Sequence, residues 1–245
     1  MIIAAICPTF RHPDLLANSV AMWNTQDYPK EKRLLLILDD AGTFHTQYGD
    51  EFLLIGCNTR FPSLPAKYNA LLGHLPPKVD AVAIWEDDDT YLPDYISSHV
   101  AALEKGPFSK PKHVWCDSSG KGLLIEEGLG KFHSNMAFSR ELIESIGGWP
   151  DTKRADFDLQ LIANLKKAAG PPVDPWPDPI PPKFIYRWHT GAAHGQWSMR
   201  SPDDETWYDR ADEAYKPVAH RGRLVAKFDE ITLKYIKELG YELQP

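Results

Sequence analysis

Four consecutive carboxylates, Glu86 to Asp89, follow the apolar run from Ala81 to Trp85. Carboxylates this close together repel one another and lower the stability of the fold unless a cation lies among them. Magnesium and manganese suit such a position, because each is a hard ion that binds carboxylate, water and phosphate oxygens together. In an extended backbone Asp87 and Asp89 would point to one side and Asp88 to the other. The run therefore predicts a site for Mn²⁺ or Mg²⁺, and a solvated acidic turn is the alternative.

A second pair of carboxylates, Asp39 and Asp40, stands where the apolar run from Leu34 to Leu38 ends and a turn of small residues begins. At the carboxyl edge of a parallel sheet, such side chains face the ligand crevice and can accept hydrogen bonds from a ribose or a base. An Asx turn or a helix cap explains the same pair equally well.

A third pair, Asp156 and Asp158, opens a predicted helix after the turn Gly147-Gly148-Trp149-Pro150. The dipole of a helix stabilises carboxylates in its first turn, so capping alone explains a pair of this kind. Its position after a Gly-Gly-aromatic turn favours a functional role.

Two histidines, His189 and His194, lie five residues apart in a loop that contains glycine and alanine. This spacing differs from the i, i+4 spacing of a helical zinc pair. Either could add a nitrogen ligand to a carboxylate-bound manganese, and a surface or hydrogen-bonded histidine is the alternative.

The elements that would position these groups alternate between strand-like apolar runs and segments with helical periodicity. Such alternation is typical of parallel strands joined by crossover helices, so we expect an α/β fold with a mostly parallel central sheet flanked by helices. The expected strands are residues 2–7, 34–38, 52–55, 81–85 and 113–116, and the expected helices are 13–23, 65–75, a segment beginning near 93, 140–146 and 157–169.

Residues 171–182 contain seven prolines, which predict a loop because proline lacks a backbone donor. We therefore expect a core over residues 1–170 and a proline-rich loop over 171–183. A C-terminal extension over 184–245 would complete the same domain. Within it we expect a strand at 184–188, a polar lid at 201–223 and a final amphipathic helix from about 224 to 239.

Bulk properties narrow the class of protein. At 245 residues one domain is expected, and a net charge of −7 argues against unspecific binding to nucleic acid. The longest apolar runs are too short to cross a bilayer and no signal segment is evident, so we expect a cytoplasmic protein without stable membrane insertion. Cys7, Cys57 and Cys116 are widely spaced, which favours free thiols over disulfides or a metal site.

In chain order, these segments resemble the motifs of family 2 glycosyltransferases and their relatives with the GT-A fold, a Rossmann-like nucleotide-diphospho-sugar transferase fold. The resemblance covers about residues 2–169. Arg11, Lys67 and Ala155 depart from the usual asparagine, arginine and glutamate. The matching segments are Pro8-Thr9-Phe10-Arg11-His12 (P-T-Y-N-R), Gln26-Asp27-Tyr28-Pro29 (Q-x-Y-P), Leu38-Asp39-Asp40-Ala41-Gly42 (V-D-D-G-S), Ala66-Lys67-Tyr68-Asn69-Ala70 (A-R-N-x-G/A), Asp87 to Asp89 with Pro93-Asp94, Gly147-Gly148-Trp149, and Ala155-Asp156-Phe157-Asp158-Leu159 (E-D-x-D-L).

The resemblance implies inverting, metal-dependent transfer of a sugar from a nucleotide-diphosphate donor, with uridine diphosphate as the expected nucleotide, to an acceptor hydroxyl. It implies Asp156 as the general base that deprotonates this hydroxyl. It also implies donor contacts from Pro8, Thr9, Asp39, Asp40, Lys67, Asp87 and Asp88, and metal binding by Asp87, Asp89 and, from a downstream segment, His194.

Two alternatives from other classes stay open. A sugar-nucleotide pyrophosphorylase would share the sheet and the carboxylates, but residues 2–13 lack the glycine-rich phosphate loop expected at its start. A non-catalytic sugar-nucleotide-binding module would keep Asp40 and the acidic run, and Ala155 favours this hypothesis. The acceptor stays open among a glycan, a lipid-linked sugar, a small metabolite and a modified base in nucleic acid, with the net charge against the last.

Overall fold

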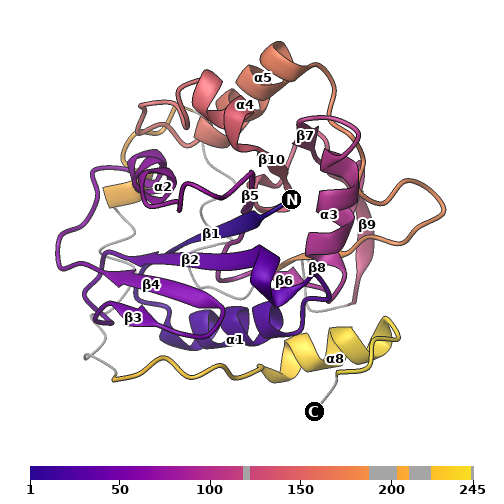
Figure 1. Ribbon diagram of the computed structural model, residues 1–245, viewed down its shortest axis with the longest axis horizontal. Helices are drawn as coiled ribbons and strands as arrows, with labels where there is room; N and C mark the ends of the chain where they lie inside the picture. Colours follow the sequence, from indigo (N-terminus) through magenta and orange to yellow (C-terminus); the bar gives the residue numbers. More distant parts are fainter. Residues whose placement is uncertain (118–121, 188–202, 210–221, 244–245) are drawn as a thin grey trace.

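The computed structural model describes residues 1–117, 122–187, 203–209 and 222–243. Helices pack on both faces of a central sheet, and a smaller sheet lies beside it (Figure 1). The main-sheet strands, in chain order, are β1 (Ile3–Thr9), β2 (Arg33–Asp39), β3 (Gln47–Tyr48), β4 (Phe52–Gly56), β5 (Ala81–Ile84), β7 (Phe108–Ser109) and β10 (Ala137–Ser139).

The seven strands of the main sheet run in the order β3-β4-β2-β1-β5-β10-β7. The inner strands β4, β2, β1 and β5 are parallel, whereas β3 and β10 pair antiparallel to their neighbours. The mostly parallel α/β sheet predicted from the sequence is therefore confirmed. Because β1, β2 and β5 are adjacent, their carboxyl ends meet at one edge.

Alternation along β1 divides the core into two layers. Ile3, Ala5 and Cys7 face one apolar cluster, and Ala4 and Ile6 face the other, as the period of a strand requires. Helices α1 (Pro13–Asn24) and α3 (Tyr95–Leu103) cover the first face; α2 (Leu64–Gly73), α4 (Arg140–Ser145) and α5 (Phe157–Ala169) cover the second (Figure 1).

A second sheet has the order β6-β11-β8-β9, made of β6 (Thr90–Tyr91), β8 (His113–Asp117), β9 (Leu124–Glu127) and β11 (Phe184–Arg187). The expected strand at 113–116 is thus β8, outside the main sheet. The proline-rich segment 171–183 has no helix, and its one bridge joins Val173 to Ser109. It delivers β11 to β6, which directly follows the acidic run.

The last helix, α8 (Glu230–Glu238), is shorter than predicted because Asp229 caps it, accepting a hydrogen bond from the Thr232 amide at 2.6 Å. Asn18 of α1 donates to Thr232 at 3.0 Å, so α8 lies against α1 (Figure 1). The described segments contain no helix with the length and apolar character needed to cross a bilayer. All three cysteines are free thiols, as expected.

Candidate donor and metal site

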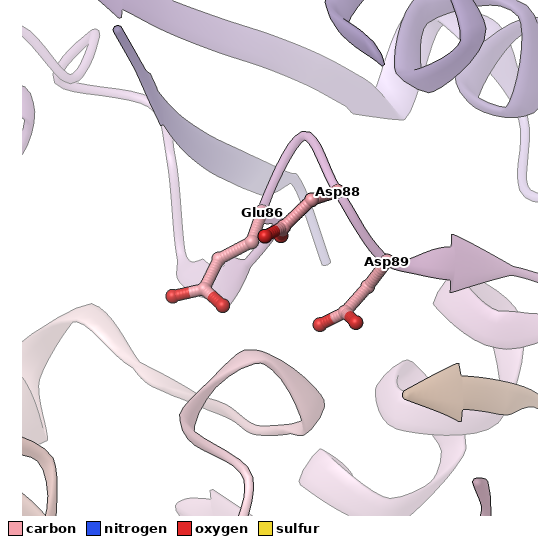
Figure 2. A group of neighbouring side chains, drawn as sticks. All are labelled: Glu86, Asp88 and Asp89. Atoms are coloured by element: carbon pink, nitrogen blue, oxygen red, sulfur yellow. The ribbon is translucent and has the colours of Figure 1, made fainter. Parts of the chain in front are cut away.

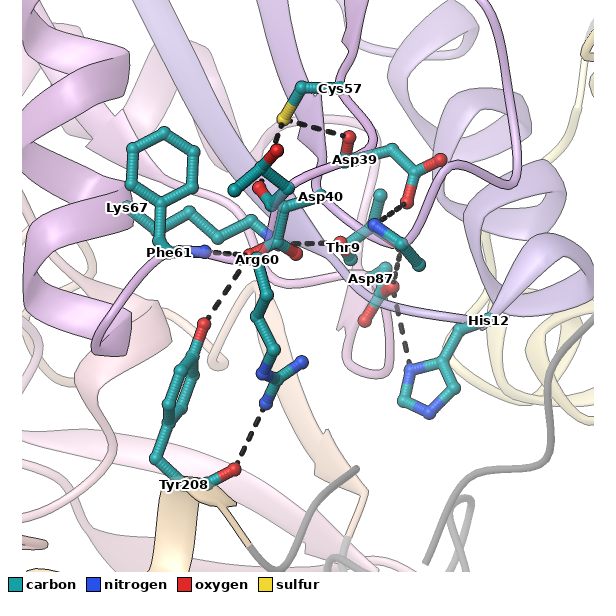
Figure 3. A network of polar contacts seen from close by, with 12 residues as sticks. Thr9, His12, Asp39, Asp40, Cys57, Arg60, Phe61, Lys67, Asp87 and Tyr208 are labelled. Atoms are coloured by element: carbon teal, nitrogen blue, oxygen red, sulfur yellow. Dashed lines mark hydrogen bonds and ion pairs between the residues drawn. The ribbon is translucent and has the colours of Figure 1, made fainter. Parts of the chain in front are cut away.

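The carboxyl ends of β1 and β5 are tied together by side chains. Thr9 donates its hydroxyl to Asp87 Oδ2 at 2.5 Å, and His12 Nδ1 lies 3.6 Å from the same oxygen (Figure 3). Asp87 therefore points toward β1 and the turn that follows it.

The carboxyl end of β2 is tied to the same place by Lys67 of α2. Its ammonium donates to the Thr9 carbonyl at 2.6 Å and to Asp40 Oδ1 at 2.5 Å (Figure 3). Both side chains of this ion pair are buried. The structure thus brings together Thr9, Asp40, Lys67 and Asp87, four of the residues that the sequence predicts to contact the donor.

The neighbouring carboxylates Asp39 and Asp40 have different surroundings. Asp39 accepts hydrogen bonds from the amides of Ala41 at 3.0 Å and Phe44 at 2.9 Å, so it stabilises its own turn. Burial raises the pKa of Asp39, and these two amides oppose that shift. Asp40 Oδ2 instead accepts from the Phe61 amide at 3.0 Å. The Asx-turn interpretation fits Asp39, and Asp40 belongs to the network with Lys67.

The acidic run forms a turn, and three of its carboxylates converge. Figure 2 shows Glu86, Asp88 and Asp89 pointing to the same side, and one potential ligand atom from each lies within 4.8 Å of the others. The expectation that Asp87 and Asp89 share a side assumed an extended backbone, and the turn at residues 87–89 replaces it. Metal binding by Asp87 stays a prediction, while Glu86 joins the cluster without having been predicted.

Asp89 is fully buried and held from two other elements. The hydroxyl of Ser134 in η2 (His133–Asn135) donates to Asp89 Oδ2, and the amide of Arg187 in β11 donates to Oδ1 at 3.1 Å. The guanidinium of Arg187 pairs with Asp229 at 3.0 Å. Nothing in the sequence singles out Ser134, because its contact spans 45 residues.

Glu86 is held by the side chains of Tyr68 and His133. It accepts a hydrogen bond from the Tyr68 hydroxyl at 2.9 Å and lies 3.2 Å from His133 Nδ1. Trp149 donates its indole N–H to His133 Nε2 at 2.9 Å, so in the neutral ring the proton resides on Nδ1 and faces Glu86. Tyr68 and Trp149 stack with ring centroids 4.7 Å apart.

The loop that carries His133 and Ser134 is anchored by a buried lysine. Lys110 donates to the carbonyls of Lys131 and Phe132 at 2.8 Å and to Asn135 Oδ1 at 2.5 Å. Burial lowers the pKa of Lys110 to about 7. This anchor fixes the backbone from which Ser134 reaches Asp89.

The donor set at the cluster fits a hard divalent cation. Glu86, Asp88 and Asp89 supply only carboxylate oxygens, which are the ligands that Mn²⁺ and Mg²⁺ prefer, and Asp88 and Asp89 are buried. Burial is the main cause that raises the pKa of the Tyr186 hydroxyl. The nearby charges of Asp89 and Asp88 add to the rise. The predicted ligand His194, and its competitor His189, lie outside the described residues.

The two carboxylates at the start of α5 differ in their partners. Asp156 accepts hydrogen bonds from Arg154 at 2.9 Å on each oxygen, and Arg154 is the main cause that lowers the pKa of Asp156. Asp158 accepts from the Leu159 amide at 2.8 Å, and burial raises its pKa.

The described part of the expected lid, residues 203–209, touches both sides of the site. The Tyr208 hydroxyl lies 3.4 Å from Asp40 Oδ2, and the guanidinium of Arg60 lies over the Tyr208 ring at 4.1 Å (Figure 3). Trp207 donates to the Lys153 carbonyl at 2.7 Å. This segment therefore bridges the β2 edge and the loop before α5.

Comparison with solved structures identifies the fold, although no protein-family model and no curated protein sequence matches the chain. S. aureus TarS 1–349 in complex with UDP-GlcNAc has a TM-score of 0.62 and 15% identity, with 82% of this chain and 62% of that chain covered. The mannosyltransferase PcManGT from Pyrobaculum calidifontis, in complex with GDP-Man and Mn²⁺, has a TM-score of 0.56 and 18% identity, with 87% and 69% covered. The chain has the GT-A fold.

The GT-A fold predicted from the sequence is thereby confirmed. The chain spans 37% of the longer S. aureus TarS chain, to which it is 13% identical with a TM-score of 0.58 over 76% of its own length. A GT-A fold by itself does not assign a reaction, so activity must be argued from the site.

Proposed function

We propose that this GT-A chain is a metal-dependent glycosyltransferase that moves a sugar from a nucleotide-diphosphate donor to an acceptor hydroxyl. One observation carries the proposal: the carboxylate cluster Glu86, Asp88 and Asp89 belongs to the same turn whose Asp87 is bonded to the network of Thr9, Asp40 and Lys67. A polar edge can accept hydrogen bonds from the nucleoside of a nucleotide-sugar, and a cation held by carboxylates can neutralise its diphosphate. Complexes of similar structures with UDP-GlcNAc, and with GDP-Man and Mn²⁺, support this assignment.

On the nucleoside side, Asp40 is the proposed side chain that accepts hydrogen bonds from the nucleotide. Lys67 forms an ion pair with Oδ1 of this buried carboxylate, and its Oδ2 accepts from the Phe61 amide and from the more distant Tyr208 hydroxyl. A ribose hydroxyl or a base N–H can replace the Tyr208 hydroxyl, because a contact of 3.4 Å is weak. Pro8, Thr9 and Asp39 would then line or support the nucleoside, and Asp87 and Asp88 would stand beside the diphosphate.

On the diphosphate side, Glu86, Asp88 and Asp89 would hold Mn²⁺ or Mg²⁺, with Ser134 and the Arg187 amide orienting Asp89. When bound, the cation supplies positive charge beside the departing diphosphate. The acceptor oxygen bonds to the anomeric carbon as the bond to the diphosphate breaks, which inverts the configuration. A carboxylate at the start of α5 takes the proton of the acceptor, and Asp156 is the one that the resemblance assigns.

Titration calorimetry with UDP-GlcNAc and GDP-Man, each with Mn²⁺ and with chelator, tests the proposal. We expect one of the two to bind in a Mn²⁺-dependent manner and Asp89→Asn to remove that dependence. Asp50→Asn, an exposed aspartate near β3, is the control and should bind as the unaltered chain does. Binding of equal strength in chelator would refute metal dependence, and slow release of free sugar by the unaltered chain would exclude a non-catalytic binding module.

A further inference from the structure

The two carboxylates at the start of α5 are unequally available. Both oxygens of Asp156 are occupied by Arg154, and Gln160 adds a third hydrogen bond to Oδ1 at 2.7 Å. Asp158 accepts one hydrogen bond, from the Leu159 amide to Oδ1. Within the described ranges, no residue donates a hydrogen bond to Asp158 Oδ2. Asp158 Oδ2 therefore has no hydrogen bond from the described residues to displace when a substrate offers a proton, whereas each oxygen of Asp156 already accepts at least one.

The two carboxylates also face different neighbours. The titratable groups around Asp158 come from four elements: Glu86 after β5, Lys110 after β7, His133 in η2 and Tyr186 in β11. Two of them, Glu86 and Tyr186, belong to or adjoin the carboxylate cluster. Asp156 is instead governed by Arg154 and Gln160, which lie on its own segment. Asp158 is thus the carboxylate of this pair that is electrostatically linked to the cluster.

We infer that Asp158, rather than Asp156, accepts the proton of the attacking hydroxyl, and that Asp156 with Arg154 is a positioning pair that fixes the start of α5. The inference rests on the proposed function. In the step, the acceptor O–H gives its proton to Asp158 Oδ2 while its oxygen bonds to the anomeric carbon. The bond from that carbon to the diphosphate oxygen breaks, and its electron pair leaves with the nucleoside diphosphate.

The pKa shifts of Asp158 and Asp156 support the same assignment as their hydrogen bonds. Burial is the main cause that raises the pKa of Asp158; Glu86 adds to the rise, and His133 and Lys110 oppose it. A carboxylate with a raised pKa holds a proton more firmly at neutral pH and is the better general base. Arg154 has the opposite effect on Asp156 and keeps it ionised when a proton is offered.

The test compares Asp158→Asn with Asp156→Asn, using water as the acceptor and UDP-GlcNAc or GDP-Man with Mn²⁺ as the donor. We expect Asp158→Asn to lower the hydrolysis rate by about 10² to 10⁴-fold, the usual range for a lost general base, with the donor Kd unchanged. Asp156→Asn should change the rate by less than about tenfold. Arg154→Met probes the same positioning pair if Asp156→Asn fails to fold, and should behave like it.

The pH profile separates a base from a structural residue. In the unaltered chain and in Asp156→Asn, kcat should fall as pH drops below the raised pKa of Asp158, and this acidic limb should be absent in Asp158→Asn. A large loss in Asp156→Asn with normal turnover in Asp158→Asn would overturn the inference alone. Metal-dependent binding without any turnover would also overturn it while leaving the donor site standing. Absence of donor binding would overturn the proposed function as well.

Discussion

Two regions of the site are built differently. The strand-edge region consists of Thr9, Asp40 and Asp87, at or just after the ends of parallel strands, and Lys67 of α2. A buried ion pair and short hydrogen bonds join them. The helix-edge region, His133, Ser134, Asp156 and Asp158, lies on a short 3-10 helix and at the start of α5.

Substitutions in the two regions should therefore have different effects. In the strand-edge region, removing one partner leaves a buried charge without its counterion, so substitutions should lower stability. In the helix-edge region, Ser134 orients Asp89 of the cluster and Asp158 has an oxygen without a hydrogen bond from the described residues, so substitutions should lower metal affinity or turnover. The following predictions set the two regions against each other.

The largest effect on folding is expected for Lys67→Met. It leaves Asp40 buried without its counterion, which destabilises a protein by about 3–5 kcal/mol. Urea denaturation should show this loss, and Lys234→Met, which breaks an exposed pair with Glu238 on α8, should cause no measurable loss. If Lys67→Met were as stable as the control, the ion pair would not be what holds the strand-edge region together.

Smaller effects, on binding, are expected for two substitutions in the acidic turn, because Asp89 belongs to the carboxylate cluster and Asp87 to the strand-edge region. Asp89→Asn should reduce the Mn²⁺-dependent gain in donor affinity at least about tenfold, or 1.4 kcal/mol. Asp87→Asn should keep most of that gain, because its carboxylate is bonded to Thr9 and is not part of the cluster. Mn²⁺ binding followed by electron paramagnetic resonance would check both substitutions. Equal losses would indicate that Asp87 also binds the metal.

The helix-edge region should tune the cluster more gently. Ser134→Ala removes the hydroxyl that donates to Asp89, and the loss of a group that orients a metal ligand lowers metal affinity about tenfold. Ser97→Ala on α3, whose hydroxyl donates to the Asp94 carbonyl, is the matched control. Titration calorimetry with Mn²⁺ alone measures both, and identical affinities would show that Ser134 only packs.

The smallest effect is expected at Tyr208. Tyr208→Phe removes a hydroxyl that lies 3.4 Å from Asp40 and keeps the ring beside Arg60, so the donor Kd should change less than about threefold. Tyr68→Phe removes a 2.9 Å hydrogen bond to Glu86 and should have the larger effect on Mn²⁺ affinity. A large change in donor Kd from Tyr208→Phe would indicate that residues 203–209 recognise the donor and do not merely cover the site.

The sequence predicts the strand-edge region far better than the helix-edge region. Asp40 and Asp87 come just after apolar runs, so periodicity locates them and parallel topology brings them together, whereas the roles of Thr9 and Lys67 came only from the resemblance to family 2 glycosyltransferases. The orientation of Asp87 could not be predicted, because it depends on a backbone turn.

Contacts between distant segments could not be predicted either. The bonds from Ser134 and Arg187 to Asp89 cross 45 and 98 residues, and no local pattern encodes them. The late start of α8 has a local cause. Asp229 caps the helix, so it begins at Glu230, although the apolar periodicity begins near residue 224.

The late position of β11 in the chain has a consequence for biosynthesis. The Arg187 amide that binds Asp89 is translated 98 residues after it, which is roughly 5 to 20 s at about 5–20 residues per second. Lys67 precedes the acidic turn, so the strand-edge region can close on the ribosome before the cluster has its last partner. During that interval Asp89 lacks its hydrogen bond from the Arg187 amide and β6 lacks its partner β11, and both contacts form only when the segment after the proline-rich loop emerges.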